Sequence, residues 1–380
     1  MADEKVFISR CETYDPDLLR RKIEQAFGAF GGAGRYAGRG TKVLLKPNML
    51  SGEPPEKAIT THPAVVEAVA RMFIDAGARV TIGDSPGIGR PAKVAEKTGI
   101  AEVARRLGIK VVDFDDSVLL KAPADFMFKK IEIARAVIEA DVMINLPKFK
   151  SHGQMIMTAA VKNLFGCIVG PRKAQWHMAA GRDRDAFARL LLELSLLVAP
   201  RFSLIDGIIG MDGNGPSAGR TRPVNLILAG EDPLAVDRIA AAVAGLKEED
   251  YPLMRTARAM PAFAERFGRI EVVGDALESV ALHDFQLPPG QDLRFGPRTL
   301  RRLLKRAVAA RPVINRRKCK ACGICAQHCP PEAISISGGR VLIDRSACIS
   351  CFCCQEMCPQ HAIDIRRGWL ARLLIRRKGQ

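Results

Sequence analysis

Nine of the eleven cysteines lie in one short segment, residues 319–358, where their spacing repeats. Both halves of the segment read CxxCxxCxxxCP, and Cys348 opens the second half as Cys319 opens the first. The residues that follow also match, since PEAISI (331–336) corresponds to QHAIDI (360–365). Thiolates at such short intervals can converge on one compact metal centre. The spacing therefore predicts metal binding rather than disulfides.

The spacing is that of bacterial two-cluster ferredoxins, in which three cysteines of one run and the fourth of the other hold each [4Fe–4S] cube. The first cluster should take Cys319, Cys322, Cys325 and Cys358, and the second should take Cys348, Cys351, Cys354 and Cys329. Two overlapping zinc sites are the alternative, but zinc ribbons rarely show this pattern twice. Cys353 does not fit the repeated cysteine spacing. We expect it to be a small packed residue rather than a spare ligand or redox thiol.

The elements that must position a reaction site lie upstream, where strand-like runs alternate with helical patterns. Strands are predicted at 42–46, 79–84, 109–114, 140–146, 201–210 and 223–230, and helices at 63–76, 92–108, 158–166, 185–198 and 233–246. This alternation predicts an α/β fold with a largely parallel sheet and flanking helices. The expected organisation is an α/β domain at 1–290, a basic linker at 291–311, a dicluster ferredoxin domain at 312–367 and a basic amphipathic tail at 368–380.

Ligands of such sheets bind beyond the carboxyl ends of the strands, where this sequence concentrates polar residues. The central stretch is NLPKFKSHGQMIMTAAVKN (145–163), whose lysines and histidine, in one loop and the following helix, would surround a phosphate or carboxylate. We expect His152, Lys150 and Asp84 to be catalytic, with His152 as acid, base or metal ligand. The expected ligand-binding set is Lys46, Asn48, Lys148, Lys162, Asn163, Asp212 and Asn214, and Asp206 could add an acid–base or metal contact.

The Gly, Pro and Asp residues at these strand ends are explained by the turns that must follow each strand, because turns favour these residue types. Turns do not require the lysines. No dinucleotide fingerprint and no GxxxxGK[ST] motif occurs in the chain, so the glycine-rich stretches do not predict a nucleotide site. The sequence therefore predicts an anionic small molecule as the ligand of the α/β domain, and a further cofactor there could be organic or a metal.

The formal net charge is +17, and much of it lies near the C-terminus. Residues 294–318 contain ten Arg or Lys and no Asp or Glu, and the tail RRGWLARLLIRRK adds six more. Such patches attract acidic proteins, anionic lipid or nucleic acid. Aromatic residues make up only 6% and do not interleave with the charges, which argues against nucleic acid. We expect an acidic electron donor or acceptor protein, with peripheral contact between the tail and an anionic membrane as a further possibility.

The N-terminus MADEKVFISR lacks the apolar core of a secretory signal, and no apolar run is long enough to span a bilayer. We therefore expect a cytoplasmic protein.

Six motifs in fixed order give the sequence a family resemblance. They are KPNML, TTHPAVVEAV, GDSPG, NLPKFKSHGQMIMTAAVKNLFG, DGIIGMDGNGP and ILAGEDPLAVD. Together they resemble the family catalogued as domain of unknown function 362, which is often fused to a dicluster ferredoxin. The resemblance covers about 40–245, and CISCFCCQEMCP resembles the attached ferredoxin unit. This resemblance implies an iron–sulfur protein, but it does not indicate which reaction the protein catalyses.

The layout of KFKSHGQMIMTAAVKNLFG is also similar to a segment of the nickel-pincer lactate racemase superfamily. That resemblance implies cofactor or substrate contacts for Lys148, Lys150, His152 and Lys162, although the gaps between motifs differ.

The sequence predicts an oxidoreductase that passes electrons between two [4Fe–4S] clusters and an anionic ligand in the α/β cleft. The alternative is a non-catalytic electron-transfer or cofactor-assembly protein whose α/β domain docks a partner.

Overall fold

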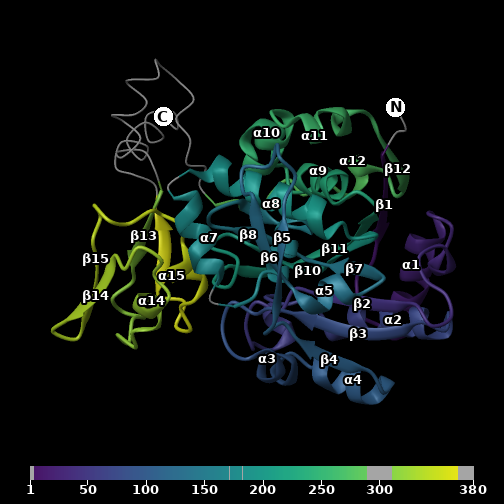
Figure 1. Ribbon diagram of the computed structural model, residues 1–380, viewed down its shortest axis with the longest axis horizontal. Helices are drawn as coiled ribbons and strands as arrows, with labels where there is room; N and C mark the ends of the chain where they lie inside the picture. Colours follow the sequence, from purple (N-terminus) through teal and green to yellow (C-terminus); the bar gives the residue numbers. More distant parts are fainter. Residues whose placement is uncertain (1–3, 171, 182, 289–309, 367–380) are drawn as a thin grey trace.

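The computed structural model describes residues 4–170, 172–181, 183–288 and 310–366. A large α/β body holds the chain up to residue 288, and a small body formed by 310–366 lies against one end of it. In Figure 1 the small body (yellow) lies on the side of α7 (Arg172–Ala180), away from β1 and α1 (Pro16–Gly28). Most of the predicted basic linker, residues 291–309, and the predicted tail lie outside the described residues.

The large body is built on one twisted sheet with strand order β12-β1-β11-β10-β7-β2-β3-β4. These strands are β1 (Glu4–Arg10), β2 (Lys42–Pro47), β3 (Arg79–Asp84), β4 (Lys110–Asp113), β7 (Val142–Leu146), β10 (Phe202–Asp212), β11 (Arg220–Gly230) and β12 (Ile270–Gly274). Neighbouring strands are parallel except at β11, which runs antiparallel to both β1 and β10. The predicted α/β fold with a largely parallel sheet is confirmed.

Both faces of the sheet are covered, which explains why its central strands are apolar throughout. Alternate residues of β2 face opposite sides: Val43 and Leu45 belong to one buried cluster and Leu44 to the other. One cluster includes α1, α2 (Pro63–Asp75), α3 (Pro91–Lys97) and α4 (Ile100–Leu107). The other includes α6 (Ala160–Asn163), α8 (Arg184–Val198), α9 (Pro233–Val243) and α10 (Pro252–Arg258). A hairpin of β5 (Ser117–Lys121) and β6 (Lys130–Ala134) adds to the second side.

Two local predictions differ from the structure. The predicted helix at 92–108 is two helices, α3 and α4, because Gly99 between them takes a φ of 78°, which ends a right-handed helix. The interpretation of KFKSH as part of a loop is wrong, because Lys148–His152 is a strand, β8. β8 pairs with β10 and with β9 (Ile156–Thr158), and each of its five residues is buried.

The small body repeats its backbone as well as its sequence. Antiparallel pairs join β13 (Arg311–Ile314) to β16 (Ile363–Arg366) and β14 (Ile334–Ser337) to β15 (Arg340–Ile343), with α14 (Ile324–Gln327) and α15 (Cys353–Glu356) between them. Left-handed residues recur at equivalent positions of the two halves: Ala321 and Ser350, Gly323 and Phe352, Glu332 and His361. Equal turns in both halves are what two similar metal-binding loops require.

No helix in the described ranges is long and apolar enough to cross a membrane.

Candidate functional site

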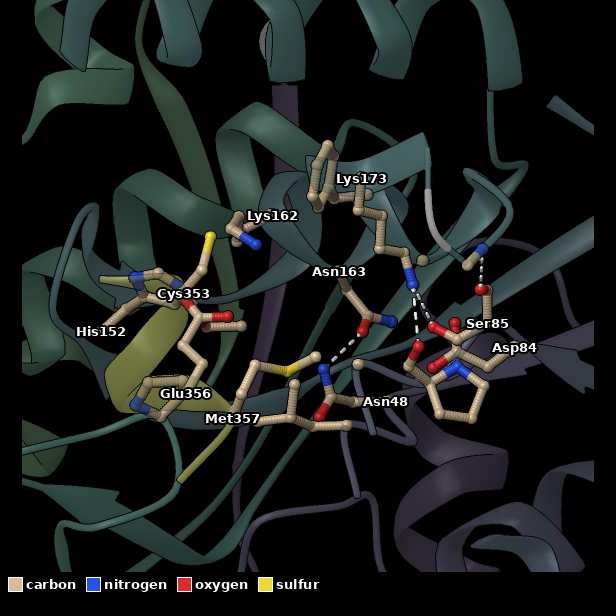
Figure 2. Close-up of a pocket in the computed structure, with 18 of the residues that line it drawn as sticks. Asn48, Asp84, Ser85, His152, Lys162, Asn163, Lys173, Cys353, Glu356 and Met357 are labelled. Carbon is tan, nitrogen blue, oxygen red and sulfur yellow. Dashed lines mark hydrogen bonds and ion pairs between the residues drawn. The ribbon is translucent and has the colours of Figure 1, made fainter. Parts of the chain in front are cut away.

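A cavity of about 330 Å³ lies where the two bodies meet, and both contribute to its wall. From the large body come the residues that follow β2 and β3, together with β8, β9, α6 and α7. From the small body come Cys353, Glu356 and Met357, on or next to α15, and His328. Figure 2 shows Cys353, Glu356, His152 and Lys162 on one side of the cavity and Lys173, Ser85 and Asp84 on the other.

The sheet topology explains this location. After β2 the chain builds outward through β3 and β4, and it then returns to place β7 on the other side of β2. In open α/β sheets a crevice forms at the carboxyl ends of the strands where the order reverses in this way. Asn48 follows β2, Asp84 ends β3, and β8 follows β7, so all three reach the same crevice.

A buried ion pair fixes the position of Asp84, which lines the cavity. Lys46 Nζ lies 2.7 Å from Asp84 Oδ1, and both side chains are almost fully buried. Asp84 Oδ2 also accepts a hydrogen bond from the Met49 backbone N–H at 2.7 Å. A Cβ at Gly166 would lie 2.0 Å from Asp84 Oδ1 and 2.6 Å from Lys46 Nζ, so only glycine leaves room for this pair.

Hydrogen bonds between side-chain amides connect Lys150, on β8, to Asn145, on β7. Lys150 Nζ donates to Asn48 Oδ1 at 2.9 Å and to the Ile59 carbonyl at 2.6 Å. Asn48 Nδ2 donates to Asn163 Oδ1, and Asn163 Nδ2 donates to Asn145 Oδ1, each at 2.9 Å. Burial lowers the pKa of Lys150 to about 7, and the carboxylate of Glu356 is the largest influence in the opposite direction. Lys150 is therefore a fixed amine that gains or loses its proton near neutral pH.

Lys173, on α7, lies at the other side of the cavity. Its Nζ donates to the carbonyls of Ser85 and Pro86 in the loop after β3. The same loop is fixed by a hydrogen bond from the Gly170 N–H to Ser85 Oγ at 2.9 Å. Burial lowers the pKa of Lys173 to about 8.

His152 lies at the junction of the two bodies. Its Nδ1 accepts hydrogen bonds from the backbone N–H groups of Gln154 and Met155, at 3.1 and 3.2 Å. The proton of a neutral ring is therefore on Nε2, which lies 2.9 Å from Glu356 Oε1 on α15. Burial lowers the pKa of His152 although Glu356 opposes that shift. Burial alone would raise the pKa of Glu356, but His152 and Lys162 outweigh it and lower that pKa to about 2.

Further hydrogen bonds hold α15 against the large body. Gln355 Nε2 donates to the carbonyls of Asn214 and Gly215, at 2.8 and 3.1 Å. Asn214 Nδ2 donates to the Ile363 carbonyl at 3.3 Å. The small body thus docks on the hairpin turn between β10 and β11, and this turn also borders the cavity.

The eight repeated cysteines surround two smaller cavities in the small body. Cys319, Cys322, Cys325 and Cys358 line one, and Cys329, Cys348, Cys351 and Cys354 line the other. Backbone N–H groups of Ala333 and Ala362 donate to the sulfurs of Cys329 and Cys358, at 3.3 and 3.2 Å. Across the described ranges, no three His, Cys, Asp or Glu side chains converge closely enough to hold a single ion. Four thiolates spread around a cavity fit a cube of iron and sulfide instead.

The structure brings most of the sequence-predicted site residues to one place. Six of them line the cavity, namely Asn48, Asp84, Lys150, His152, Lys162 and Asn163, and Lys46 lies directly behind Asp84. The others lie elsewhere. Lys148 forms a buried pair with Asp206 at 2.7 Å and is hydrogen-bonded to Tyr14, Asp212 pairs with Arg220 and Arg222, and Asn214 contacts the small body.

Sequence reasoning did not single out Thr158, Lys173, His177, Glu356 or Met357, all of which line the cavity. Cys353, expected to be a packed residue, lies in the cavity wall as well as being buried. One signal was available for the residues of α15. The two halves of the repeat differ there, since Cys353, Gln355 and Glu356 stand where the first half has Ile324, Ala326 and Gln327.

Comparison with known proteins gives a family and one close relative. Residues 43–242 match the family described as "Domain of unknown function (DUF362)", and residues 311–359 match a "4Fe-4S dicluster domain". The thylakoid-associated protein sll1697 of Synechocystis sp. is 38% identical over 251 residues, which cover 66% of this chain and 78% of that protein.

Two solved structures show a weaker likeness, each at 12% identity. The lactate racemase apoprotein of Thermoanaerobacterium thermosaccharolyticum has a TM-score of 0.42 and aligns over 64% of this chain and 57% of its own. A protein from Thermotoga maritima has a TM-score of 0.40, with 63% and 61% covered. The chain spans less than two thirds of either protein, and such low scores support no inference about function. On the family matches, the chain is an iron–sulfur protein that belongs to the DUF362 family and carries a C-terminal 4Fe-4S dicluster domain.

Proposed function

We propose that the protein is an oxidoreductase in which the dicluster domain exchanges electrons with an anionic substrate or cofactor in the cavity. The observation that carries the proposal is the position of α15. This short helix bears Cys354, a proposed cluster ligand, and also presents Cys353 and Glu356 to the cavity. A ligand in the cavity would therefore touch the same helix that holds a cluster.

The proposal includes two [4Fe–4S] clusters. One is assigned to Cys319, Cys322, Cys325 and Cys358 and the other to Cys348, Cys351, Cys354 and Cys329. When bound, such clusters supply single electrons at potentials that their surroundings set. Two ligands of the second set, Cys329 and Cys354, directly follow wall residues, whereas only Cys358 of the first set does so. The second cluster is therefore the proposed partner of the ligand.

The cavity side chains support the proton and charge changes that must accompany electron transfer. A ligand that gains electrons also needs protons, because negative charge in a buried site is costly. Lys150 can hold or release a proton near neutral pH, and His152 presents Nε2 at the edge of the cavity. We assign proton transfer to these two residues. Asp84 holds the Lys46 amine in place through their ion pair.

The proposed electron donor or acceptor outside the protein is an acidic protein. Exposed basic residues surround the first cysteine run, where Arg316, Arg317 and Lys318 immediately precede Cys319. Cys322 of the same run is itself exposed. Complementary charge at this surface would steer an acidic partner to the cluster assigned to the first cysteine run.

A carrier or assembly protein that only docks partners remains the alternative function. The cavity favours the oxidoreductase because Lys150, His152 and His177 are buried in its wall, and a docking surface needs no buried ionisable groups.

The test uses full-length protein prepared anaerobically with its clusters intact. The reduced protein is mixed with a panel of small carboxylates and phosphate esters, including compounds that co-purify with it, while the cluster absorbance is followed. We expect one compound to reoxidise the clusters over repeated turnovers, and Lys150→Met and His152→Gln to lose this reaction while their reduced-cluster EPR spectra stay unchanged. The exposed Lys110 supplies a control, Lys110→Met. If both cavity variants exchange electrons with every compound as the wild type does, the chain is a carrier and the proposal is wrong.

A further inference from the structure

We propose that the end of the cavity nearest the small body is an oxyanion subsite, in which Lys162 and Thr158 hold a carboxylate or phosphate group beside Cys353. The inference rests on the proposed function and deepens it. It names the chemical group that is bound and the end of the ligand that faces the clusters.

Lys162 differs from the other lysines of the site. Lys46 pairs with Asp84, Lys150 donates to Asn48 and a carbonyl, and Lys173 donates to two carbonyls. Within the described part of the chain, Lys162 Nζ has no hydrogen-bond or ion-pair partner. Its nearest recorded contact is with the ring of Phe165, 4.7 Å from Nζ to the centroid. Figure 2 shows its amine directed into the space beside Cys353 and Glu356.

Thr158 supplies the second, independent observation. Thr158 lines the same cavity, its side chain is only 3% exposed, and its Oγ1 has no hydrogen-bond partner among the described residues. A buried hydroxyl left without a partner destabilises the folded protein. Lys162 is partly buried, and water can solvate its ammonium less well there than at an open surface. A ligand oxygen that lies between the two groups would give each of them a partner.

An oxygen anion fits these groups better than a cation or a neutral apolar molecule. Lys162 can only donate hydrogen bonds, and Thr158 can donate one. Burial lowers the pKa of Lys162, and a bound anion would favour its charged form. The cavity volume of about 330 Å³ limits the ligand to a small molecule. The structure therefore points to a small carboxylic acid or phosphate compound whose anionic end lies nearest the clusters.

One competing explanation is that Lys162 only neutralises Glu356. In that case Lys162→Met would leave a buried carboxylate with less compensation and would destabilise the protein. If Lys162 instead serves to bind a ligand, the variant should keep or raise the thermal midpoint, because a partly buried amine without a protein partner has been removed.

The binding test uses inorganic phosphate and acetate as probes on full-length protein with reduced clusters. Reduced [4Fe–4S] clusters are paramagnetic, so a bound probe near them shows faster ³¹P or ¹³C relaxation that saturates with concentration. We expect this effect for one or both probes, and a loss of affinity of about tenfold or more in Lys162→Met, as expected for one charge-assisted hydrogen bond. Lys162→Arg should retain binding, Thr158→Val should weaken it, and Lys110→Met should match the wild type.

The inference is overturned if neither probe relaxes faster, or if Lys162→Met binds as tightly as the wild type. Binding seen by calorimetry without faster relaxation would also overturn it, because the anion would then lie away from the clusters. Since no turnover is measured, the outcome is separate from that of the proposed function. Saturable binding at Lys162 without any electron exchange would refute the oxidoreductase alone.

Discussion

Lys150 and Lys173 have similar surroundings in the cavity. Lys150 is buried and Lys173 is partly buried, each amine donates to backbone or amide oxygens, and burial lowers the two pKa values to about 7 and about 8. Neither amine has a carboxylate within ion-pair distance in the described part of the chain, unlike Lys46. These two lysines therefore remain available to a ligand, and their charge depends on pH.

Ligand binding should depend on pH for this reason. A bound anion favours the charged amine and raises the lowered pKa of Lys150, so binding takes up a proton. Affinity should then be highest below pH 7 and fall as the pH rises through 7 and 8. The groups that act on Lys150 are Glu356 and Asp84, which favour its charge, and Lys162 and Lys148, which oppose it.

Calorimetry of phosphate or acetate binding in buffers of different ionisation enthalpy measures the proton uptake directly. Lys150→Met should reduce both the uptake and the slope of affinity against pH. Constant affinity from about pH 6 to about pH 9 would contradict this assignment.

The ion pair of Lys46 and Asp84 gives a second prediction at the residue scale. Gly166→Ala places a methyl group against both charged atoms and should break the pair, with a cost of about 3–5 kcal/mol for an uncompensated buried charge. The thermal unfolding midpoint measures the effect. Gly34→Ala is the matched control, since a Cβ there meets no atom within 4 Å and φ is not positive. Equal midpoints for the two variants would show that the site tolerates the methyl group.

At the scale of elements, β8 shows what sequence patterns miss. KFKSH carries two lysines, a serine and a histidine, which are typical of an exposed loop, and no alternation of apolar residues marks it as a strand. It is buried because β10 extends beyond β7 and pairs with it, while β9 covers its other edge. Only this tertiary pairing makes the polar side chains part of an interior cavity.

Helix α15 is the second informative element, because its contacts join the two bodies. Gln355→Leu would leave the carbonyls of Asn214 and Gly215 without their donor and should weaken docking by about 1–3 kcal/mol. We expect faster hydrogen exchange at 213–217 and 352–357 in this variant. Gln327→Leu changes the exposed glutamine at the end of the equivalent helix α14 and should leave the same peptides unaffected. Equal exchange in both variants would mean that Gln355 does not hold the bodies together.

At the scale of the whole molecule, the two bodies differ in what stabilises them. The large body has two extensive apolar clusters, one on each face of the sheet. The small body has one small cluster, of which three of the six fully buried members are cysteines. A domain of this size has too small an apolar core to be stable on that core alone, so its folding should depend on the metal centres.

Removal of iron should therefore unfold the small body and open the cavity. After anaerobic chelation, protease cleavage should increase within 310–366 while the strands of the large body stay protected, and binding of the oxyanion probes should be lost. Peptide mapping by mass spectrometry measures the first effect, and calorimetry measures the second. A small body that remains protected without iron would show that its protein contacts are sufficient.

The sequence predicted the fold class, most strands and the grouping of the cysteines, because each depends on short-range patterns of apolar residues or on fixed spacing. It also gathered Asn48, Lys150, His152 and Lys162 correctly around one crevice, since strand ends meet at one edge of a parallel sheet. It could not separate Lys148 from Lys150, because Tyr14 and Asp206, the partners of Lys148, lie far away in the chain. Glu356 was missed because its role depends on how the two bodies dock.

The shared wall formed by α15 also bears on how such a protein could be inherited or redesigned. Two domains that are joined only by a linker can be exchanged, because the binding site of each lies wholly within that domain. Here a substitute ferredoxin would bring equivalent clusters, yet with glutamine at the position of Glu356, as Gln327 stands in the first half, it would leave His152 without its carboxylate partner. Exchange of the small body would therefore change the wall of the cavity as well as the loops that carry the cysteines.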